Sequence, residues 1–159
     1  MPLSISVVGR LEHQHETISE LIGDITEAQL KERVNPDKWS AFEQIVHLAA
    51  YQPTFIYRLE LMLEGKKPGF ERYVAENDPR FYEYLKKSLP ELLKDISANR
   101  LIITGRLINL NEDELKLVGH HPKFGYVAIG KWAEFFLLHE AHHLFVMMQL
   151  IGALYVTQQ

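Results

Sequence analysis

The chain has 159 residues, of which 47% are hydrophobic and 24% charged, and its formal net charge at pH 7 is −4. This length and composition predict one globular domain, residues 1–159, with enough chain to bury a core. There is no cysteine, which excludes disulfides, thiolate metal ligands and a cysteine nucleophile. The absence of a basic block argues against a nucleic-acid partner. The absence of a signal-peptide pattern or of 18 consecutive apolar residues predicts a cytoplasmic protein with no membrane span.

Helical periodicity dominates the first half of the chain, and no segment shows a convincing strand pattern. Apolar residues recur every three or four positions from about Ser6 to Ile25, which predicts a first helix. A second helix is predicted to begin after Ser40, an N-cap residue that forms a capping box with Glu43. It continues through an interior proline to Gly65.

The second half of the chain predicts two more long helices. Two of the connections, one in each half of the chain, also contain predicted helical turns. A third helix opens at the Asp78-Pro79 pair and extends to about Leu110, with Pro90 as an irregularity that allows two shorter helices instead. A fourth runs from about Ile129 to Tyr155. Residues 26–39 predict a short helical turn, and residues 111–130 a turn of helix followed by a loop over one end of the molecule. The expected fold is all-α, an antiparallel four-helix bundle with long connections.

The fourth helix carries the sequence "LLHEAHHLFVM", which contains the H-E-x-x-H pattern. His139 and His143 are four residues apart, so on a helix they differ by about 40° in direction and about 6 Å along the axis. Both replace apolar residues on the stripe that faces the core, where an unsatisfied polar group costs about 1 to 3 kcal/mol. The pair therefore indicates either two metal ligands or two core histidines that are hydrogen-bonded to other groups.

A zinc peptidase would need a third ligand downstream and Glu140 as general base. No Asp, Glu or His follows His143 in the chain. Glu140 also lies about 100° around the helix from His139. The sequence therefore argues against a peptidase.

A third ligand is available upstream, because His47 is the only histidine in the second helix. A histidine on one helix of an antiparallel bundle can meet an i, i+4 pair on another. Three nitrogens on one side of an ion leave coordination positions open, which is typical of catalytic rather than structural sites. The alternative for His47 alone is a polar residue at the edge of the core stripe.

Four further residues are candidates for the surroundings of such a site. His15 lies on the apolar stripe of the first helix and Glu43 one turn before His47, so either could orient or complete the ligand set. Tyr51 and Arg58 follow His47 at helical spacing, and they either line the mouth of a pocket or pack and solvate in the ordinary way.

Two stretches, "DKWSAFEQIVHLA" around His47 and "LLHEAHHLFVMMQLIG" near the C-terminus, resemble the DinB-like superfamily of four-helix-bundle metal proteins. The resemblance implies a divalent metal, zinc or nickel, held by His47, His139 and His143, and a homodimer acting on a small-molecule substrate. Characterised relatives include S-transferases that use bacillithiol, mycothiol or glutathione, and other members are described as metal-dependent hydrolases. Many members continue after the last histidine with a small residue and a glutamine, whereas this chain has Leu144 and Phe145.

The resemblance and the residues together lead to competing functions. The first is a thiol-dependent S-transferase, in which the ion activates a low-molecular-weight thiol whose anionic part contacts Tyr51, Arg58 or the loop 119–126. The second is a hydrolase that activates water at the same ion. A third is a non-catalytic metal-binding stress protein, which predicts a closed site with a fourth ligand such as His15 or Glu43. The last is a metal-free interaction bundle.

Overall fold

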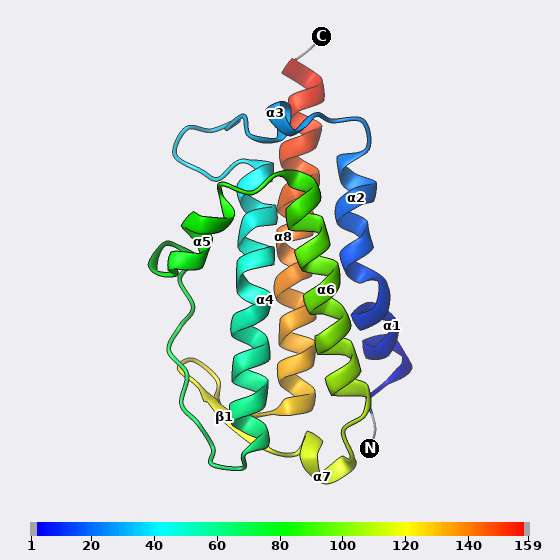
Figure 1. Ribbon diagram of the computed structural model, residues 1–159, viewed down its shortest axis with the longest axis vertical. Coiled ribbons are helices and arrows are strands. Elements are labelled where there is room, and N and C mark those ends of the chain that lie inside the picture. The colour runs from blue at the N-terminus through cyan, green and yellow to red at the C-terminus, as the bar shows by residue number, and fades with distance from the viewer. Residues whose placement is uncertain (1–2, 158–159) are drawn as a thin grey trace.

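The computed structural model describes residues 3–157, and these form a bundle of four long helical segments (Figure 1). This confirms the predicted all-α four-helix bundle. The first segment is broken into two helices joined by a 3-10 turn, and the other three are continuous. In chain order the segments are α1 (Ile5–His13), η1 (Gln14–Glu16) and α2 (Thr17–Ile22), then α4 (Ala41–Leu63), α6 (Leu89–Ile108) and α8 (Ile129–Thr157).

The four segments do not simply alternate in direction. In Figure 1, α1–α2 and α8 run upward, whereas α4 and α6 both run downward. Helix α4 packs against both α6 and α8. Two neighbours, α4 and α6, are parallel because the connection 64–88 carries the chain back along the bundle before α6 starts. This crossover contains η2 (Ala75–Asn77) and α5 (Pro79–Tyr84).

Helix α4 begins as its sequence predicts. The Ser40 hydroxyl accepts a hydrogen bond from the Glu43 backbone N–H at 3.2 Å, and the Glu43 carboxylate accepts one from the Ser40 N–H at 2.7 Å. These two bonds satisfy backbone donors that the first turn leaves unpaired. The helix then continues without interruption past Pro53 to Leu63. The cap therefore sets the position of every residue on this helix relative to the bundle.

The predicted continuity of the first helix is wrong, whereas the third pattern follows one of its two predicted alternatives, two separate helices. The first helix was predicted unbroken to Ile25, but it changes to a 3-10 turn at Gln14–Glu16 and ends at Ile22, where Gly23 adopts φ +50°. Beyond Ile22 the chain forms the short helix α3 (Glu27–Leu30). In the third pattern, α6 starts separately from α5 because Ser88 caps it and Pro90 fits its first turn.

The expectation that the chain contains no strand is wrong. After α7 (Glu112–Leu115), strands β1 (Val118–His121) and β2 (Gly125–Ala128) pair as an antiparallel hairpin. Each strand has only four residues, too short for an alternating pattern to be visible in the sequence. The hairpin is also tied to the crossover, because the Phe70 N–H donates to the His120 carbonyl at 3.0 Å and the His120 N–H to the Pro68 carbonyl at 2.8 Å.

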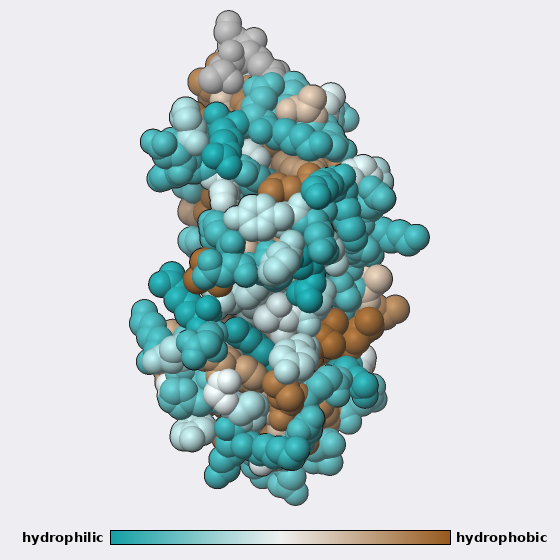
Figure 2. Space-filling model, turned by 60° about the vertical axis from the view of Figure 1, so that its left-hand side comes forward, coloured by the Kyte–Doolittle hydropathy of each residue, from teal (hydrophilic) through white to brown (hydrophobic). Residues whose placement is uncertain are grey.

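The interior of the bundle is apolar, with one charged pair. Buried aliphatic and aromatic residues from all four segments fill it, among them Leu11, Ile18, Ile45, Leu59, Ile96, Ile103, Phe136 and Met147. The surface in Figure 2 is largely hydrophilic, with its most prominent hydrophobic patch in the lower half of the view. Among the residues described, no helix combines the length and the apolar character needed to span a bilayer.

Candidate metal centre

Three histidine side chains from two helices meet inside the bundle. His47 comes from α4, and His139 and His143 come from consecutive turns of the antiparallel neighbour α8. The His139 Nε2 atom lies 3.0 Å from His47 Nε2 and 3.2 Å from His143 Nε2. Each ring offers one nitrogen, and the three nitrogens all lie within 4.8 Å of one another. The structure therefore brings together the three histidines that the sequence selects.

Burial keeps all three imidazoles neutral at physiological pH. It lowers the pKa of His47 to about 3, that of His139 to about 4 and that of His143 to about 2. Neighbouring histidines add to each shift, because one protonated ring would repel another. A neutral imidazole has a free lone pair, which is the form that a cation binds.

A hydrogen bond fixes the orientation of His143. Its Nδ1–H donates to the Gln44 side-chain oxygen at 2.6 Å. Gln44 is itself 7% exposed and lies one turn before His47 on α4. With the proton on Nδ1, the Nε2 lone pair of His143 points toward the other two rings. This is the arrangement by which a hydrogen-bonded partner orients a metal-binding histidine.

The donor set fits a small divalent cation. Two nitrogens bound tetrahedrally to Zn²⁺ at about 2.0 to 2.1 Å are about 3.3 Å apart. The observed Nε2 separations of 3.0 and 3.2 Å lie close to that value. Each neutral ring has one N–H and one lone pair, and the N–H of His143 is used by Gln44. Without a cation, the Nε2 lone pair of His143 therefore faces the other two rings. The spacing by itself also fits an N–H···N hydrogen bond. The feature that favours a metal is therefore the gathering of three neutral imidazole nitrogens at one point.

No fourth histidine or carboxylate joins this cluster among residues 3–157. Glu43, one candidate, forms an ion pair with Arg33 at 2.5 Å in addition to its capping bonds. His15, the other, lies in η1 and lines a separate cavity with Ser19 and Ile96. The side chains leave one side of the three-histidine centre open.

The glutamate of the H-E-x-x-H pattern faces away from the histidines. Glu140 is 2% exposed, and it accepts hydrogen bonds from the Gln14 amide at 2.9 Å and from the Arg100 guanidinium. Gln14 belongs to η1 and Arg100 to α6, whereas His139 and His143 face α4. Glu140 therefore cannot serve as a general base at the cluster, and the pattern is not a peptidase site.

The open side of the cluster leads into a cavity of about 700 Å³. Aromatic rings form its inner wall. The Trp39 ring centroid lies 5.2 Å from that of His47, the Tyr73 ring 5.8 Å from His47, and the Tyr51 ring 4.9 Å from His139. The volume is large enough for a small organic molecule that reaches the histidines.

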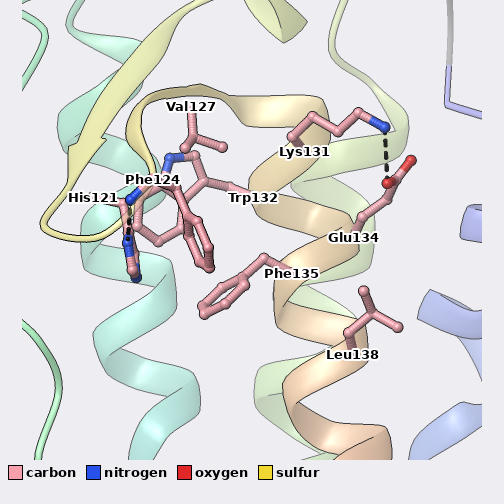
Figure 3. A pocket seen from close by; sticks show the side chains of 8 residues that line it. All are labelled: His121, Phe124, Val127, Lys131, Trp132, Glu134, Phe135 and Leu138. Atoms are coloured by element: carbon pink, nitrogen blue, oxygen red, sulfur yellow. Dashed lines mark hydrogen bonds and ion pairs between the residues drawn. The ribbon is translucent and has the colours of Figure 1, made fainter.

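The hairpin supplies the outer wall of the cavity. His121 and Phe124 line it together with Phe135 of α8, and the same three side chains border a smaller apolar pocket of about 210 Å³ between the hairpin and α8. Figure 3 shows the hairpin crossing over the start of α8, with the rings of Phe124 and Phe135 close together. The His121 Nδ1 accepts hydrogen bonds from the backbone N–H groups of Lys123 and Phe124, which holds this turn in shape.

Part of the cavity lining is predictable from the sequence, and part is not. Tyr51 and Arg58 both line it, as does part of the loop 119–126. Gln44 was missed, although its position three residues before His47 placed it on the same helix face. Arg72 and Tyr73 were also missed, because nothing in the sequence shows where the crossover passes.

The fold and the cluster define a four-helix-bundle protein with a three-histidine centre. A family model described as the DinB superfamily matches residues 10–147, and the chain belongs to that superfamily. It is similar to a solved structure with a TM-score of 0.79 and 18% identity, which covers 91% of this chain and 83% of the other. That structure is described as YfiT from Bacillus subtilis, a probable metal-dependent hydrolase with an unusual four-helix bundle topology. No curated protein matches the chain.

Proposed function

We propose that this protein is a metal-dependent enzyme in which His47, His139 and His143 hold a divalent cation and a low-molecular-weight thiol binds at the open side. The observation that carries the proposal is the convergence of three neutral imidazoles on a cavity without a fourth protein ligand. Three imidazole nitrogens suit both zinc and nickel. When bound, the ion would act as a Lewis acid that favours ionisation of a thiol entering the site.

The residues around the cluster have distinct tasks in this proposal. Gln44 holds the His143 ring in the metal-binding tautomer. Trp39, Tyr51 and Tyr73 exclude water from one side of the centre. The chain contains no cysteine, so the nucleophilic thiol, such as bacillithiol or glutathione, has to arrive as a substrate. The resulting activity is an S-transferase: the thiol loses its proton to solvent, its sulfur bonds to an electrophilic carbon, and the leaving group of that carbon, such as chloride, departs with the electron pair.

Hydrolysis is the second candidate, because the same open centre could activate water and YfiT, which shares the fold, is described as a probable metal-dependent hydrolase. The non-catalytic alternative requires a fourth side-chain ligand. Of its two candidates, Glu43 pairs with Arg33, and His15 lines a separate cavity. The open cavity therefore favours an enzyme over a structural metal site.

We also propose a homodimer, as the family resemblance implies. Three apolar side chains on the outer face of α8 are more than two-fifths exposed, namely Leu138 at 61%, Phe145 at 55% and Met148 at 48%. Phenylalanine and methionine are enriched in interfaces relative to the rest of a protein surface. Sedimentation equilibrium measures the mass directly, and a monomer at all concentrations would contradict the proposal.

The metal premise is tested by elemental analysis of protein purified without a histidine tag. We expect near-stoichiometric metal in the wild type and a small fraction of one ion per chain in His143→Ala. His142→Ala is the matched control, because His142 is exposed on the same helix and outside the cluster. Near-stoichiometric metal in His143→Ala would show that the ligand assignment is wrong.

The thiol premise is tested by an assay of glutathione and bacillithiol against a monochlorobimane-type electrophile. We expect conjugation above the uncatalysed rate, lost when a chelator removes the metal and restored when zinc or nickel is returned. Equal rates with and without metal would remove the mechanism. Metal-dependent cleavage of ester or amide substrates without thiol conjugation would favour the hydrolase.

A further inference from the structure

The mouth of the cavity is positively charged, although the chain as a whole is negative. Three cationic side chains line the cavity, Arg58, Arg72 and Lys123. Among the described residues, the only carboxylate residue lining it is Glu76. The net charge of the chain is −4. The excess of cations is therefore a local property of this cavity.

Arg58 is the best-defined of the three cations. It is 9% exposed, its Nη2 donates to the Glu71 backbone carbonyl at 2.8 Å, and its guanidinium carbon lies 5.1 Å from the Phe70 ring centroid. These contacts hold the guanidinium in place but leave its charge uncompensated, because it forms no ion pair within residues 3–157. A buried charge without a partner is costly unless something else neutralises it.

Arg72 and Lys123 extend the positive surface from the crossover and from the hairpin turn. Both are exposed, and neither forms an ion pair in the described part of the chain. Lys123 lies 5.6 Å from the Phe124 ring centroid. Glu71 and Asp78 line a neighbouring hollow. There Asp78 is paired with Arg80 at 3.6 Å and accepts a hydrogen bond from the Tyr73 hydroxyl. Three separate segments thus bring free cations to one opening.

The cations line the same cavity as the three histidines. The positive charge of Arg58 acts on the Tyr51 hydroxyl, where it opposes the rise in pKa that burial causes. The Tyr51 ring in turn lies 4.9 Å from the His139 ring. Arg58 and Lys123 also act electrostatically on His121 in the cavity wall, where they reinforce the lowering of its pKa by burial. One small molecule can therefore span from the cations to the three-histidine centre.

We infer that the molecule bound at the three-histidine centre carries an anionic group, a carboxylate or a phosphate, which Arg58, Arg72 and Lys123 bind at the mouth of the cavity. The inference rests on the proposed function in one respect only: the other end of the same molecule is the group that meets the metal. The planar guanidinium of Arg58 provides paired donors that match the oxygens of a carboxylate or phosphate. The substrate class is therefore an anionic thiol rather than a neutral one.

Calorimetric titration of the zinc-loaded protein tests the inference with defined probes. Mercaptosuccinate carries a thiol and two carboxylates, 1-thioglycerol carries a thiol and no charge, and succinate and inorganic phosphate carry charge without a thiol. We expect mercaptosuccinate to bind at least about tenfold more tightly than 1-thioglycerol, since each exposed ion pair contributes up to about fivefold in affinity. The difference should shrink as salt is added.

Variants test whether the cations of the cavity, and not the overall charge of the protein, bind the anionic group. The double variant Arg72→Gln with Lys123→Gln should lower the affinity for mercaptosuccinate about tenfold and leave the affinity for 1-thioglycerol unchanged. Lys94→Gln, an exposed cation on α6 outside the cavity, should change neither. Arg58→Lys keeps the positive charge but removes the paired donors of the guanidinium, and we expect it to lower the affinity for mercaptosuccinate as well. Thermal unfolding confirms that each variant is folded.

The outcomes distinguish the two proposals. Equal affinity for mercaptosuccinate and 1-thioglycerol would overturn the anion site. So would a loss of mercaptosuccinate affinity in Lys94→Gln as large as that in the double variant of Arg72 and Lys123. If neither thiol binds but succinate or phosphate binds and needs Arg72 and Lys123, the anion site stands and the thiol function fails. The tighter of those two anions identifies the group. If neither the anions nor mercaptosuccinate binds, the inference is wrong.

Discussion

Gln44 has a role in the centre that no other residue near it duplicates. Its oxygen accepts the Nδ1 proton of His143, whereas the Nδ1 atoms of His47 and His139 are buried and have no partner among the described residues. One of the three imidazoles therefore has a fixed tautomer, and the other two do not. In this superfamily member, the polar contact to the last histidine comes from the facing helix α4 rather than from the residues that follow His143.

Replacing Gln44 by Leu should weaken metal binding about 10- to 100-fold, because loss of a partner that orients a ligand histidine has that size of effect. Gln44→Glu keeps an acceptor at the same place and should retain most of the affinity. Competition with a chromophoric chelator measures the metal affinity of both variants. Equal loss in the two variants would mean that packing, and not the hydrogen bond, is what the site needs.

The pH dependence of metal binding follows from the lowered pKa values. Three histidines with an ordinary pKa of about 6.5 would lose about 50-fold in affinity between pH 7.5 and 6, because protons compete with the metal. Here the pKa values of about 3, 4 and 2 keep the rings neutral over that range. We expect the affinity to change by less than about threefold. A loss near 50-fold would show that the rings are as solvated as free histidine.

At the scale of elements, α8 presents different chemistry to each of its neighbours. Its His139 faces α4, and the adjacent Glu140 faces η1 and α6 through Gln14 and Arg100. His143 also faces α4, through Gln44. The Arg100 and Glu140 side chains are each 2% exposed, and Arg100 also donates to the Leu11 carbonyl. Helix α8 thus carries both the three-histidine cluster's i, i+4 pair and one partner of the buried ion pair with α6.

Glu140→Gln should destabilise the protein by about 3 to 5 kcal/mol, since it leaves the Arg100 charge unpaired in the core. Replacing both residues, as Arg100→Met with Glu140→Leu, should recover much of that loss. Urea unfolding measures the stability, and elemental analysis at low temperature should show unchanged metal per folded chain. If Glu140→Gln instead abolished turnover without lowering stability, Glu140 would belong to the reaction.

At the scale of the whole molecule, two connections enclose the site. The crossover contributes Arg72 and Tyr73, and the hairpin contributes His121 and Phe124. The two connections are joined by the backbone hydrogen bonds of His120 with Phe70 and Pro68. Gly119 lies at this junction. A Cβ atom there would meet the Phe70 ring at 2.6 Å and the Met62 sulfur at 2.8 Å.

Gly119→Ala should therefore lower the free energy of unfolding by about 1 to 3 kcal/mol, as overpacking of a filled site does. It should also weaken ligand binding in the cavity, because the hairpin wall has to shift. Gly105→Ala is the control: it lies in α6 with no atom within 4 Å of the added Cβ, and alanine favours a helix by up to about 1 kcal/mol. Unchanged stability in Gly119→Ala would show that the junction is loosely packed.

The helices and the metal-site candidates were predictable because their signals are local. The Ser40–Glu43 box and the spacing of His139 and His143 depend only on the geometry of one helix. The single histidine of α4 could then be paired with them, because a bundle brings facing stripes together. The composition of the chain also required that any thiol nucleophile come from outside.

The tertiary structure decided everything that depends on how distant segments meet. It set α4 parallel to α6, paired the hairpin with the crossover, turned Glu140 toward Arg100, and placed Gln44 against His143 and the cations at the cavity mouth. None of these follows from periodicity, because irregular connections carry no repeating pattern and a polar residue on a helix does not show which neighbour it faces. The sequence by itself determined which residues have the right chemistry, and only the packing of the four segments selected which of them share one site.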